Sequence, residues 1–291
     1  MSNNSSHIWR FFTMRKLIID AGSTKTEWIL LDGGRVVDRF TLGGYNPNYN
    51  EPDVLLDLLY QDLKNFPAVD AVYYYGSGCG TTANQEATAQ FLRVRFEEAV
   101  VVEVTHDLMA VCHAVLGHDK GIACILGTGA NSCLYDGKDV VDRAVSLGYL
   151  VGDEGSGCYL GRQVAKAYFY DWMPLELKLS FEQCYHLELK EFIDNVYHKQ
   201  GASKYLAGFA KFAGDHQQHP FIKNLVKDGF REFIRVFVLR YPEARLLPVS
   251  FVGSVAYYFQ ELLQECLEAE GLTLGKVRQT PSEGLIRFHQ S

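Results

Sequence analysis

In the stretch Leu17-Ile18-Ile19-Asp20-Ala21-Gly22-Ser23-Thr24-Lys25-Thr26-Glu27-Trp28, an apolar run ends in a carboxylate, a glycine and hydroxyl side chains follow, and a second apolar run heads back. This pattern predicts a β-hairpin with a small polar tip. Gly22 would let the backbone approach a ligand closely. Asp20, at the end of the first strand, could hold the water shell of Mg²⁺. A polar tip that binds nothing is the alternative.

A second stretch repeats this design. Gly121 to Leu126 is an apolar strand, Gly127-Thr128-Gly129-Ala130-Asn131 is a tip, and Ser132 to Tyr135 returns. The segment after each hairpin also matches: residues 32–39 and 136–143 are identical at six of eight positions without a gap. We interpret this as an internal duplication, with chance similarity between two turns as the alternative. Two such units would place two glycine tips on either side of a cleft.

The order of predicted elements defines the domains. Three strands and then alternating helices and strands fill residues 14–117, and the pattern restarts within residues 118–281, which are more helical. One strand, Ala99 to Val104, is almost entirely apolar, so we expect it to be buried on both faces. Residues 282–291 predict a short last helix that packs back on the first domain, and residues 1–13 a flexible tail. The fold class is therefore α/β, with two domains of mixed β-sheet flanked by helices.

Composition narrows the possible partners. The chain has 291 residues, 47% of them hydrophobic, and a net charge of −7, which argues against nucleic acid or an anionic membrane as the main partner. No run of 18 apolar residues occurs, so no membrane span is expected. Seven cysteines without a C-x-x-C pair suit a reducing cytoplasm and argue against a structural zinc site. The 17 Tyr and 18 Phe permit a homodimer without showing one.

Three motifs in this order resemble those of the actin-like ATPase superfamily, which includes sugar kinases. They are Asp-x-Gly-x-Thr-x-Thr at residues 20–26, Leu-Gly-Thr-Gly-Ala-Asn at 126–131 and Val-Gly-Ser-Val at 252–255. In addition, Gly148-Tyr149-Leu150-Val151-Gly152-Asp153-Glu154-Gly155-Ser156 is similar to a loop of the N-acetylglucosamine kinase branch, within the BadF/BadG/BcrA/BcrD-type ATPase family. The resemblance runs from about Met14 to the C-terminus and implies two actin-like, ribonuclease H-like domains.

The resemblance also implies a role for each matching residue. The nucleotide and its Mg²⁺ would be held by Asp20, Gly22, Ser23, Thr24, Lys25, Gly127, Thr128, Gly129, Gly253 and Ser254. The sugar would be held by Asn46, Asn131, Gly148, Asp153 and Glu154. Asp107 would be the base that takes the proton from the sugar hydroxyl. Simpler alternatives stay open: Asp107 could only cap the helix that follows it, Asn46 could be a turn residue, Lys25 could lie on the surface, and Asp153 with Glu154 could form a solvated turn.

The function implied by the resemblance is ATP-dependent phosphorylation of the 6-hydroxyl of an N-acetylated amino sugar in the cytoplasm. N-acetylglucosamine is the first candidate substrate, with N-acetylmuramate or glucosamine next. ATP and Mg²⁺ are the expected cofactors, with Asp20 holding the metal through water. Two other functions remain open. One is an ATPase that activates a dehydratase or reductase through an iron–sulfur cluster, although Cys158 lies after the glycines of its loop rather than before them. The other is a sugar-sensing protein without catalysis.

Overall fold

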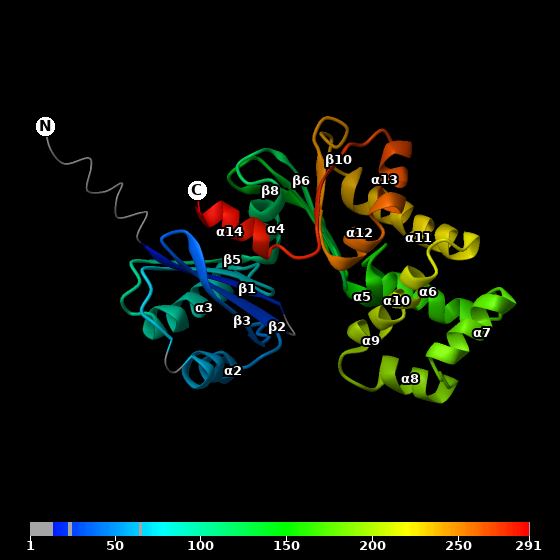
Figure 1. Ribbon diagram of the computed structural model, residues 1–291, viewed down its shortest axis with the longest axis horizontal. Helices are drawn as coiled ribbons and strands as arrows, with labels where there is room; N and C mark the ends of the chain where they lie inside the picture. Colours follow the sequence, from blue (N-terminus) through cyan, green and yellow to red (C-terminus); the bar gives the residue numbers. More distant parts are fainter. Residues whose placement is uncertain (1–13, 23–24, 64–65, 291) are drawn as a thin grey trace, which may run out of the picture. The chain divides into compact units, whose positions relative to one another are not determined.

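The computed structural model describes residues 14–22, 25–63 and 66–290. The chain divides into two compact units. Unit 1 comprises the residues up to Gly117 together with those from Pro281 onward, and unit 2 runs from His118 to Thr280. Figure 1 shows the return of the last helix, drawn in red, to the strands of unit 1. The expected flexible tail, residues 1–13, lies outside the described residues, as do Ser23 and Thr24.

Unit 1 is built on a five-stranded mixed sheet in the order β3-β2-β1-β4-β5. Strands β1 and β2 form the predicted hairpin, and β1, β4 and β5 run parallel, so their carboxyl ends meet at one edge. One face of the sheet packs on α2 and α3, and α4 and α14 cover the other. The elements are β1 Arg15–Ala21, β2 Lys25–Asp32, β3 Arg35–Gly43, α2 Pro52–Asp57, β4 Ala71–Gly76, α3 Thr82–Arg95, β5 Val101–His106, α4 Asp107–Val115 and α14 Ser282–Gln290.

Alternating side chains of the strands explain this two-sided packing. Trp28, Ile19 and Tyr74 lie side by side on neighbouring strands and are buried in the core beneath α2 and α3. The next residue along β4, Tyr75, points to the opposite face, where its hydroxyl contacts His113 of α4. Because residues 71–75 are apolar or aromatic throughout, both faces of β4 can be buried.

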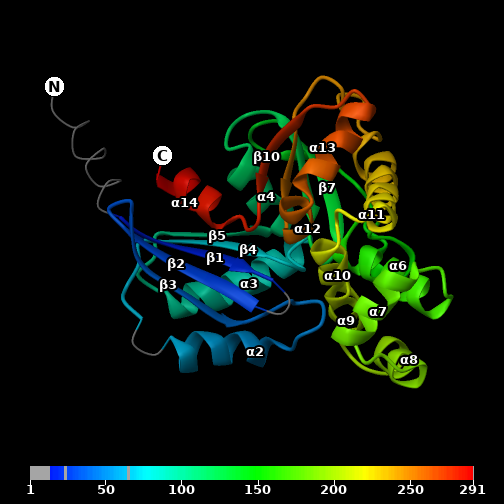
Figure 2. The same ribbon diagram turned by 45° about the vertical axis from the view of Figure 1, so that its right-hand side comes forward.

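Unit 2 repeats the sheet in the order β10-β9-β6-β7-β8 and adds helices (Figure 2). A register shift interrupts the second antiparallel pair in both sheets, just before the repeated turns Asp32-Gly33 and Asp136-Gly137. The shared strand order and shift agree with the predicted duplication. The elements are β6 Gly121–Leu126, β7 Ala130–Tyr135, β8 Val140–Arg143, α5 Gly148–Val151, α6 Gly157–Phe169, α7 Leu175–Cys184, α8 Leu189–Tyr197, α9 Ala202–Gly208, α10 Ala210–Asp215, α11 Pro220–Phe233, β9 Val249–Val252, α12 Ser254–Tyr258, α13 Gln260–Ala269 and β10 Leu274–Arg278.

The two mixed sheets with flanking helices confirm the predicted fold class. Three local expectations were less accurate. Strand β5 is only half-buried, because it is the edge strand of its sheet and has one neighbour, β4. From the sequence, apolar residues at helical spacing predict one helix near residues 52–66 and another near residues 220–241. In the structure, each passes from an α-helix into a π-helical turn, Leu58–Asp62 and Ile234–Val238. No helix in the described part of the chain is long and apolar enough to cross a membrane.

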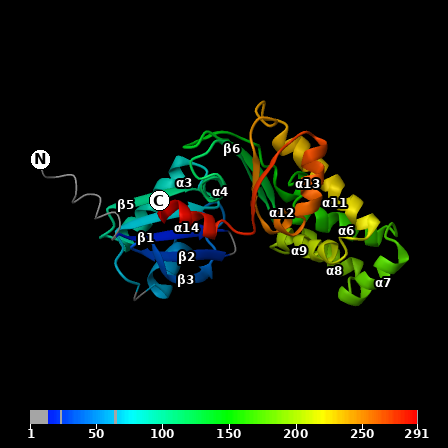
Figure 3. The ribbon, with the colours of Figure 1, turned by 45° about the horizontal axis from the view of Figure 1, so that its top comes forward.

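The last helix, α14, is part of unit 1. It runs without a break over Ser282–Gln290 and buries Leu285 and Ile286 against unit 1 (Figure 3). Gly284 allows a close approach to α4, because a Cβ at this position would lie 2.3 Å from the carbonyl oxygen of Ala114. A larger residue here would force the two helices apart.

Candidate active site

Two carboxylates meet at the edge of the unit 1 sheet where the parallel strands end. Asp20 is the last residue but one of β1, and Asp107 directly follows β5. Burial, together with the negative charges of Glu27 and Asp107, raises the pKa of Asp20 to about 7, while the positive charge of Lys25 acts in the opposite direction. A raised pKa in a group of neighbouring carboxylates is typical of catalytic and metal-binding sites.

Asp107 begins helix α4 and is held from two sides. Its Oδ1 accepts a hydrogen bond from the N–H of Leu108 at 2.9 Å, and its Oδ2 accepts one from the hydroxyl of Ser77 at 3.4 Å. Burial raises the pKa of Asp107, while His106 and these hydrogen bonds act against the rise. The capping alternative is wrong in one respect: His106 occupies the N-cap and its Nδ1 accepts the N–H of Met109. Asp107 is therefore the first residue of the helix and not its N-cap.

Ser77 was missed by the sequence analysis. It follows β4, the strand between the two that carry the carboxylates. A sequence signal existed, because Gly76-Ser77-Gly78 ends a predicted strand just as Asp20 and Thr105-His106-Asp107 do. Parallel order of the three strands would have brought these ends together.

The first hairpin tip closes tightly. The N–H of Gly22 donates to the carbonyl of Lys25 at 3.0 Å, and a Cβ at Gly22 would lie only 3.1 Å from that oxygen. Lys25 is exposed, so its ammonium is free to reach an anion in solvent. Ser23 and Thr24, the other two tip residues expected to contact phosphate, lie outside the described residues.

The environment of Asp20 suits a hydrated Mg²⁺. Among the described residues, none donates a hydrogen bond to its carboxylate, although the group is buried and surrounded by negative charge. The described chain also contains no cluster of three or more His, Cys, Asp or Glu side chains that could hold a metal directly. Mg²⁺ keeps several waters and commonly uses one or two carboxylates together with phosphate oxygens. Asp20 can supply such a carboxylate.

Asn46 lies in the loop after β3 and is 5% exposed. Its side-chain oxygen accepts the N–H of Asn48 at 3.0 Å, and its N–H donates to the side chain of Asn50. The same oxygen packs on Gly78, where a Cβ would lie 2.1 Å away. Asn46 thus has the local hydrogen bonds of a turn residue, and it ties the loop to the segment that carries Ser77.

In unit 2, the second tip is anchored by its own backbone. The N–H of Gly127 donates to the carbonyl of Gly129 at 3.0 Å, and the carbonyl of Gly127 accepts the N–H of Gly157, the first residue of α6, at 2.7 Å. Gly253 lies against this tip with φ of +141°, and a Cβ there would be 2.2 Å from the carbonyl oxygen of Leu126. The motifs at residues 126–131 and 252–255 are therefore in direct contact.

Asp153 lies beside the same tip. Its Oδ1 accepts the N–H of Ala130 at 3.3 Å, and its Oδ2 would be 3.1 Å from a Cβ at Gly129. The residue is 8% exposed and has φ of +57°, a strained backbone that often marks a functional position. Burial raises its pKa, and the neighbouring Glu154 contributes in the same direction. The alternative of a solvated turn is therefore wrong for Asp153.

The three remaining predicted sugar residues of unit 2 have different local environments. Asn131 is half-buried, and its side-chain oxygen accepts the N–H of Ser132. Glu154 is half-buried next to Asp153. Gly148 begins the short helix α5 with φ of +70° and open space around it. All three lie in unit 2, whereas Asn46 lies in unit 1.

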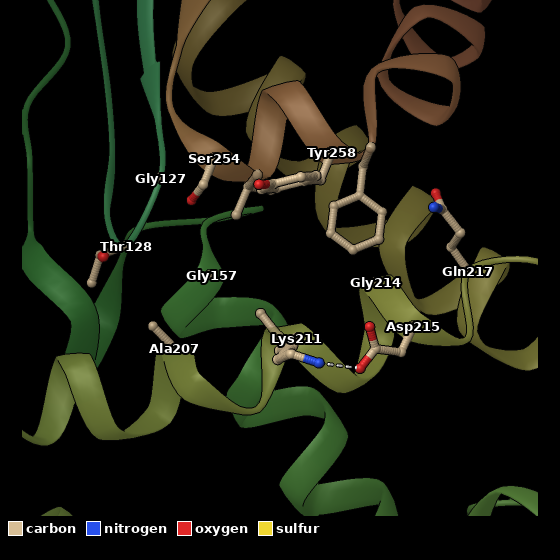
Figure 4. A pocket seen from close by; sticks show the side chains of 13 residues that line it. Gly127, Thr128, Gly157, Ala207, Lys211, Gly214, Asp215, Gln217, Ser254 and Tyr258 are labelled. Atoms are coloured by element: carbon tan, nitrogen blue, oxygen red, sulfur yellow. Dashed lines mark hydrogen bonds and ion pairs between the residues drawn. The ribbon is translucent and has the colours of Figure 1, made fainter. Parts of the chain in front are cut away.

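A cavity of about 580 Å³ opens beside the tip, within unit 2 (Figure 4). Thr128 and Ser254 place hydroxyls at one end, and the ring of Tyr258 lies above it. Small residues of α9 and α10 form the opposite wall, where Lys211 pairs with Asp215 at 2.6 Å. Its full lining is Gly127, Thr128, Gly157, Ala207, Ala210, Lys211, Gly214, Asp215, Gln217, Ser254, Val255, Tyr258 and Phe259.

The size and lining of this cavity suit a planar base with an attached polar group, because aromatic and small apolar side chains surround it and hydroxyls gather at one end. Sequence reasoning found Gly127, Thr128 and Ser254 but missed Lys211 and Tyr258. Tyr258 could have been suspected from its position one helical turn after Ser254. Nothing in the sequence near Lys211 marks the wall that α10 contributes.

Comparison with known proteins places the chain among sugar kinases. No protein-family model matches it, and no curated protein matches it in a sequence search. Among solved structures, it is 38% identical to a candidate N-acetylglucosamine kinase from Porphyromonas gingivalis, with a TM-score of 0.89, covering 94% of this chain and 98% of that one.

Two more distant structures share the fold. A candidate N-acetylglucosamine kinase from Chromobacterium violaceum is 17% identical, with a TM-score of 0.63 over 95% of this chain and 99% of that one. A ROK family glucokinase from Streptomyces griseus, solved with glucose and AMPPNP, is 16% identical, with a TM-score of 0.54 over 94% and 98%. With the first relative matched along nearly its whole length, the chain belongs to the N-acetylglucosamine kinase-like family of the actin-like ATPase and sugar kinase superfamily.

Proposed function

We propose that the protein transfers the γ-phosphoryl group of ATP to the 6-hydroxyl of an N-acetylated amino sugar, with N-acetylglucosamine as the first candidate. The observation that carries this proposal is the pair of buried carboxylates, Asp20 and Asp107, at one sheet edge in a chain of this family. Phosphoryl transfer requires positioning and charge neutralisation more than covalent chemistry. Two carboxylates in different environments can divide these tasks.

Asp107 is the proposed general base. The attacking sugar hydroxyl must lose its proton as it bonds to phosphorus, and a carboxylate whose pKa is raised accepts a proton more readily than an ordinary one. The hydrogen bonds from Leu108 and Ser77 fix the orientation of the carboxylate. The N-terminal end of α4 also favours the negative form that must be present before the reaction.

Asp20 is the proposed anchor for Mg²⁺ through its water shell. Bound there, the ion would offset the charge on the β- and γ-phosphates. The burial of Asp20 near the negative charge of Asp107 makes a divalent cation favourable beside it, since the cation relieves the repulsion between the two carboxylates. Gly22 and Lys25 of the same hairpin, together with Ser23 and Thr24, are the proposed phosphate contacts from unit 1.

The nucleotide is proposed to occupy the cavity of unit 2. Its base would lie against Tyr258 and the small residues of α10, and the hydroxyls of Thr128 and Ser254 would face the ribose and phosphates. Gly129 and Gly253 keep the adjacent backbone free of side chains, so the phosphates can approach closely.

The sugar is proposed to contact Asn46, Asn131, Gly148, Asp153 and Glu154. Asp153 is the strongest of these candidates, because it combines burial, a raised pKa and a strained backbone next to the second tip. Carboxylates bind sugar hydroxyls as hydrogen-bond acceptors, and a bond to a charged group is stronger than a neutral one.

The test is ADP release by the purified protein with Mg-ATP and a panel of sugars. N-acetylglucosamine, N-acetylmannosamine, N-acetylmuramate, glucosamine and glucose would be compared, with 6-deoxy-N-acetylglucosamine as the control that lacks the attacked hydroxyl. We expect ADP release with an N-acetylated sugar and none above background with the 6-deoxy compound. ADP release with the 6-deoxy compound at the same rate would contradict attack through this hydroxyl, and ADP release with no sugar would contradict the kinase.

A further inference from the structure

Glu27 of strand β2 lies directly opposite Asp20 in the sheet. The two residues are direct partners in the antiparallel pair of β1 and β2, so their side chains share one face of the sheet. Like charges directly opposite each other are destabilising. A second carboxylate beside the proposed Mg²⁺ anchor would also compete with it for the ion, unless something holds it elsewhere.

Both oxygens of Glu27 are in fact occupied. Oε1 accepts the Nε–H of Arg39, from strand β3, at 2.5 Å. Oε2 accepts the hydroxyl of Ser282, the first residue of α14, at 2.5 Å. Arg39 in turn pairs with Oε1 of Glu283 through its Nη1, at 2.7 Å. Glu27 is therefore held by a network from two elements that are far apart in the sequence.

Ser282 lies at the buried end of the network that holds Glu27. It is fully buried, and the side chains of Arg39 and Glu283 are 39% and 60% exposed, so the network has a fixed inner end and a solvated outer end. Helix α14 itself is fixed at several points along its length. The ring of His289 shares a hydrogen bond with the hydroxyl of Tyr75 at 2.9 Å, and Gly284 packs on Ala114 of α4.

Helix α14 therefore contacts elements that lie next to both Asp20 and Asp107. Through Ser282 it reaches the strand opposite Asp20, and through Gly284 it reaches α4, the helix that Asp107 begins. Figures 1 and 3 show α14 next to β1 and α4. The contacts at Ser282 lie at the site end of the helix, whereas Gln290, at the other end, donates to the carbonyl of Gly34 in the turn between β2 and β3.

We propose that Ser282 and Glu283 are positioning residues, which with Arg39 hold Glu27 away from Asp20 so that Asp20 alone faces the metal and the phosphates. The proposal rests on the proposed kinase function. If Ser282 is lost, one oxygen of Glu27 is released and can turn toward Asp20 and the cation. The released carboxylate would then compete with Asp20 for the cation, and small displacements of reacting groups slow a reaction steeply.

The test compares Ser282→Ala with Gln290→Ala, which removes a hydrogen bond between the same helix and the same unit at the far end. We expect Ser282→Ala to lower kcat about tenfold with the sugar KM unchanged, and Gln290→Ala to leave kcat as in the wild type. Glu283→Gln, a change to an exposed side chain that leaves the buried Ser282 in place, should lower kcat in the same direction by less. Equal kcat values for Ser282→Ala and Gln290→Ala would overturn the proposal.

A double-mutant cycle separates positioning from a structural effect. Glu27→Gln removes the competing charge, so it should keep most of the wild-type kcat, and Ser282→Ala added to it should cause no further loss. A tenfold loss that persists in the Glu27→Gln background would refute the role assigned to Ser282.

A readout independent of activity distinguishes this inference from the proposed function. Hydrogen exchange of the amides in residues 15–32 should be faster in Ser282→Ala than in Gln290→Ala, because only the first change releases Glu27 on β2. A wild-type protein that phosphorylates no sugar but shows this difference would count against the kinase and not against the contact. Active wild type with identical exchange in the two variants would count against the contact.

Discussion

Replacing Asp20 by Asn should stabilise the protein above neutral pH while it removes the proposed metal anchor. In the folded chain the pKa of Asp20 is raised to about 7, mainly by burial and then by the charges of Glu27 and Asp107, whereas an ordinary Asp has a pKa of 3.8. Between these two values the folded state holds a proton that the unfolded state has lost. Stability therefore falls as pH rises through this range, and the loss is complete above pH 7.

The size of the effect follows from the shift. Each pKa unit corresponds to about 1.4 kcal/mol, so the ionised Asp20 costs at most about 4 kcal/mol of unfolding free energy at pH 8. Asn has nearly the same volume and never ionises, so it escapes this cost. Near pH 4, where the folded Asp20 is protonated, the two proteins should be about equally stable.

The measurement is thermal unfolding from pH 5 to 8.5 with EDTA present. We expect the melting temperature of the wild type to fall relative to that of Asp20→Asn as pH rises. Asp136→Asn is the matched control, because the N–H groups of Asp139 and Lys138 lower the pKa of Asp136, so its replacement should destabilise at neutral pH. If Asp20→Asn melts below the wild type at pH 8, the reasoning about this buried charge is wrong.

Three further substitutions test the site. Asp107→Asn removes the proposed base but keeps an acceptor for the N–H of Leu108. Steady-state kinetics should show kcat lowered about 10²–10⁴-fold, and calorimetry should show an unchanged nucleotide affinity. A loss in kcat below tenfold would argue against a base. Gly253→Ala should lower the free energy of unfolding in urea by roughly 2–6 kcal/mol, because of backbone strain and overpacking. Gly271→Ala, also at positive φ but with no atom nearer than 4.0 Å, should cost about 1 kcal/mol. Equal losses in the two variants would be inconsistent with the contact at Leu126. Asp153→Asn tolerates the same backbone, so it should raise the sugar KM more than tenfold without changing nucleotide affinity, and an unchanged KM would remove Asp153 from the sugar site.

Much of the fold was readable because its signals are local. Apolar runs of strand length that end in Asp20, Gly76 and His106 predicted the strands, and a parallel arrangement is enough to bring such ends to one edge. The duplication was readable because the repeated turns at Asp32 and Asp136 kept their residues. Both inferences use neighbours in the sequence or the regular geometry of a sheet.

The parts that sequence reasoning missed depend on contacts between distant segments. An apolar composition does not distinguish an edge strand from a central one, so β5 was expected to be more buried than it is. Helix α10 forms a wall of the unit 2 cavity with Lys211, although nothing nearby in the sequence indicates a ligand. The Glu27–Ser282 contact joins residues at opposite ends of the chain, and no periodicity or turn signal could relate them.

The two units share a strand order, but the serine at one equivalent strand end has different contacts in each unit. In both units a Gly-Ser pair follows the strand parallel to the first one: Gly76-Ser77 in unit 1 and Gly253-Ser254 in unit 2. In unit 1 the serine donates to Asp107, the residue after the next strand. In unit 2 the serine lines the cavity instead.

The residues at equivalent strand ends explain this difference. Unit 1 ends its first strand with Asp20-Ala21 and its last with His106-Asp107, whereas unit 2 ends the corresponding strands with Ile125-Leu126 and Arg278-Gln279. Unit 1 thus has carboxylates at the two strand ends where we propose the metal anchor and the base. Unit 2 has no acidic residue at these two strand ends, and the carboxylate beside its tip, Asp153, comes from a later loop. If the two units share a reaction, the acidic ends favour activation of the acceptor in unit 1, and the uncharged, glycine-rich ends favour the nucleotide in unit 2.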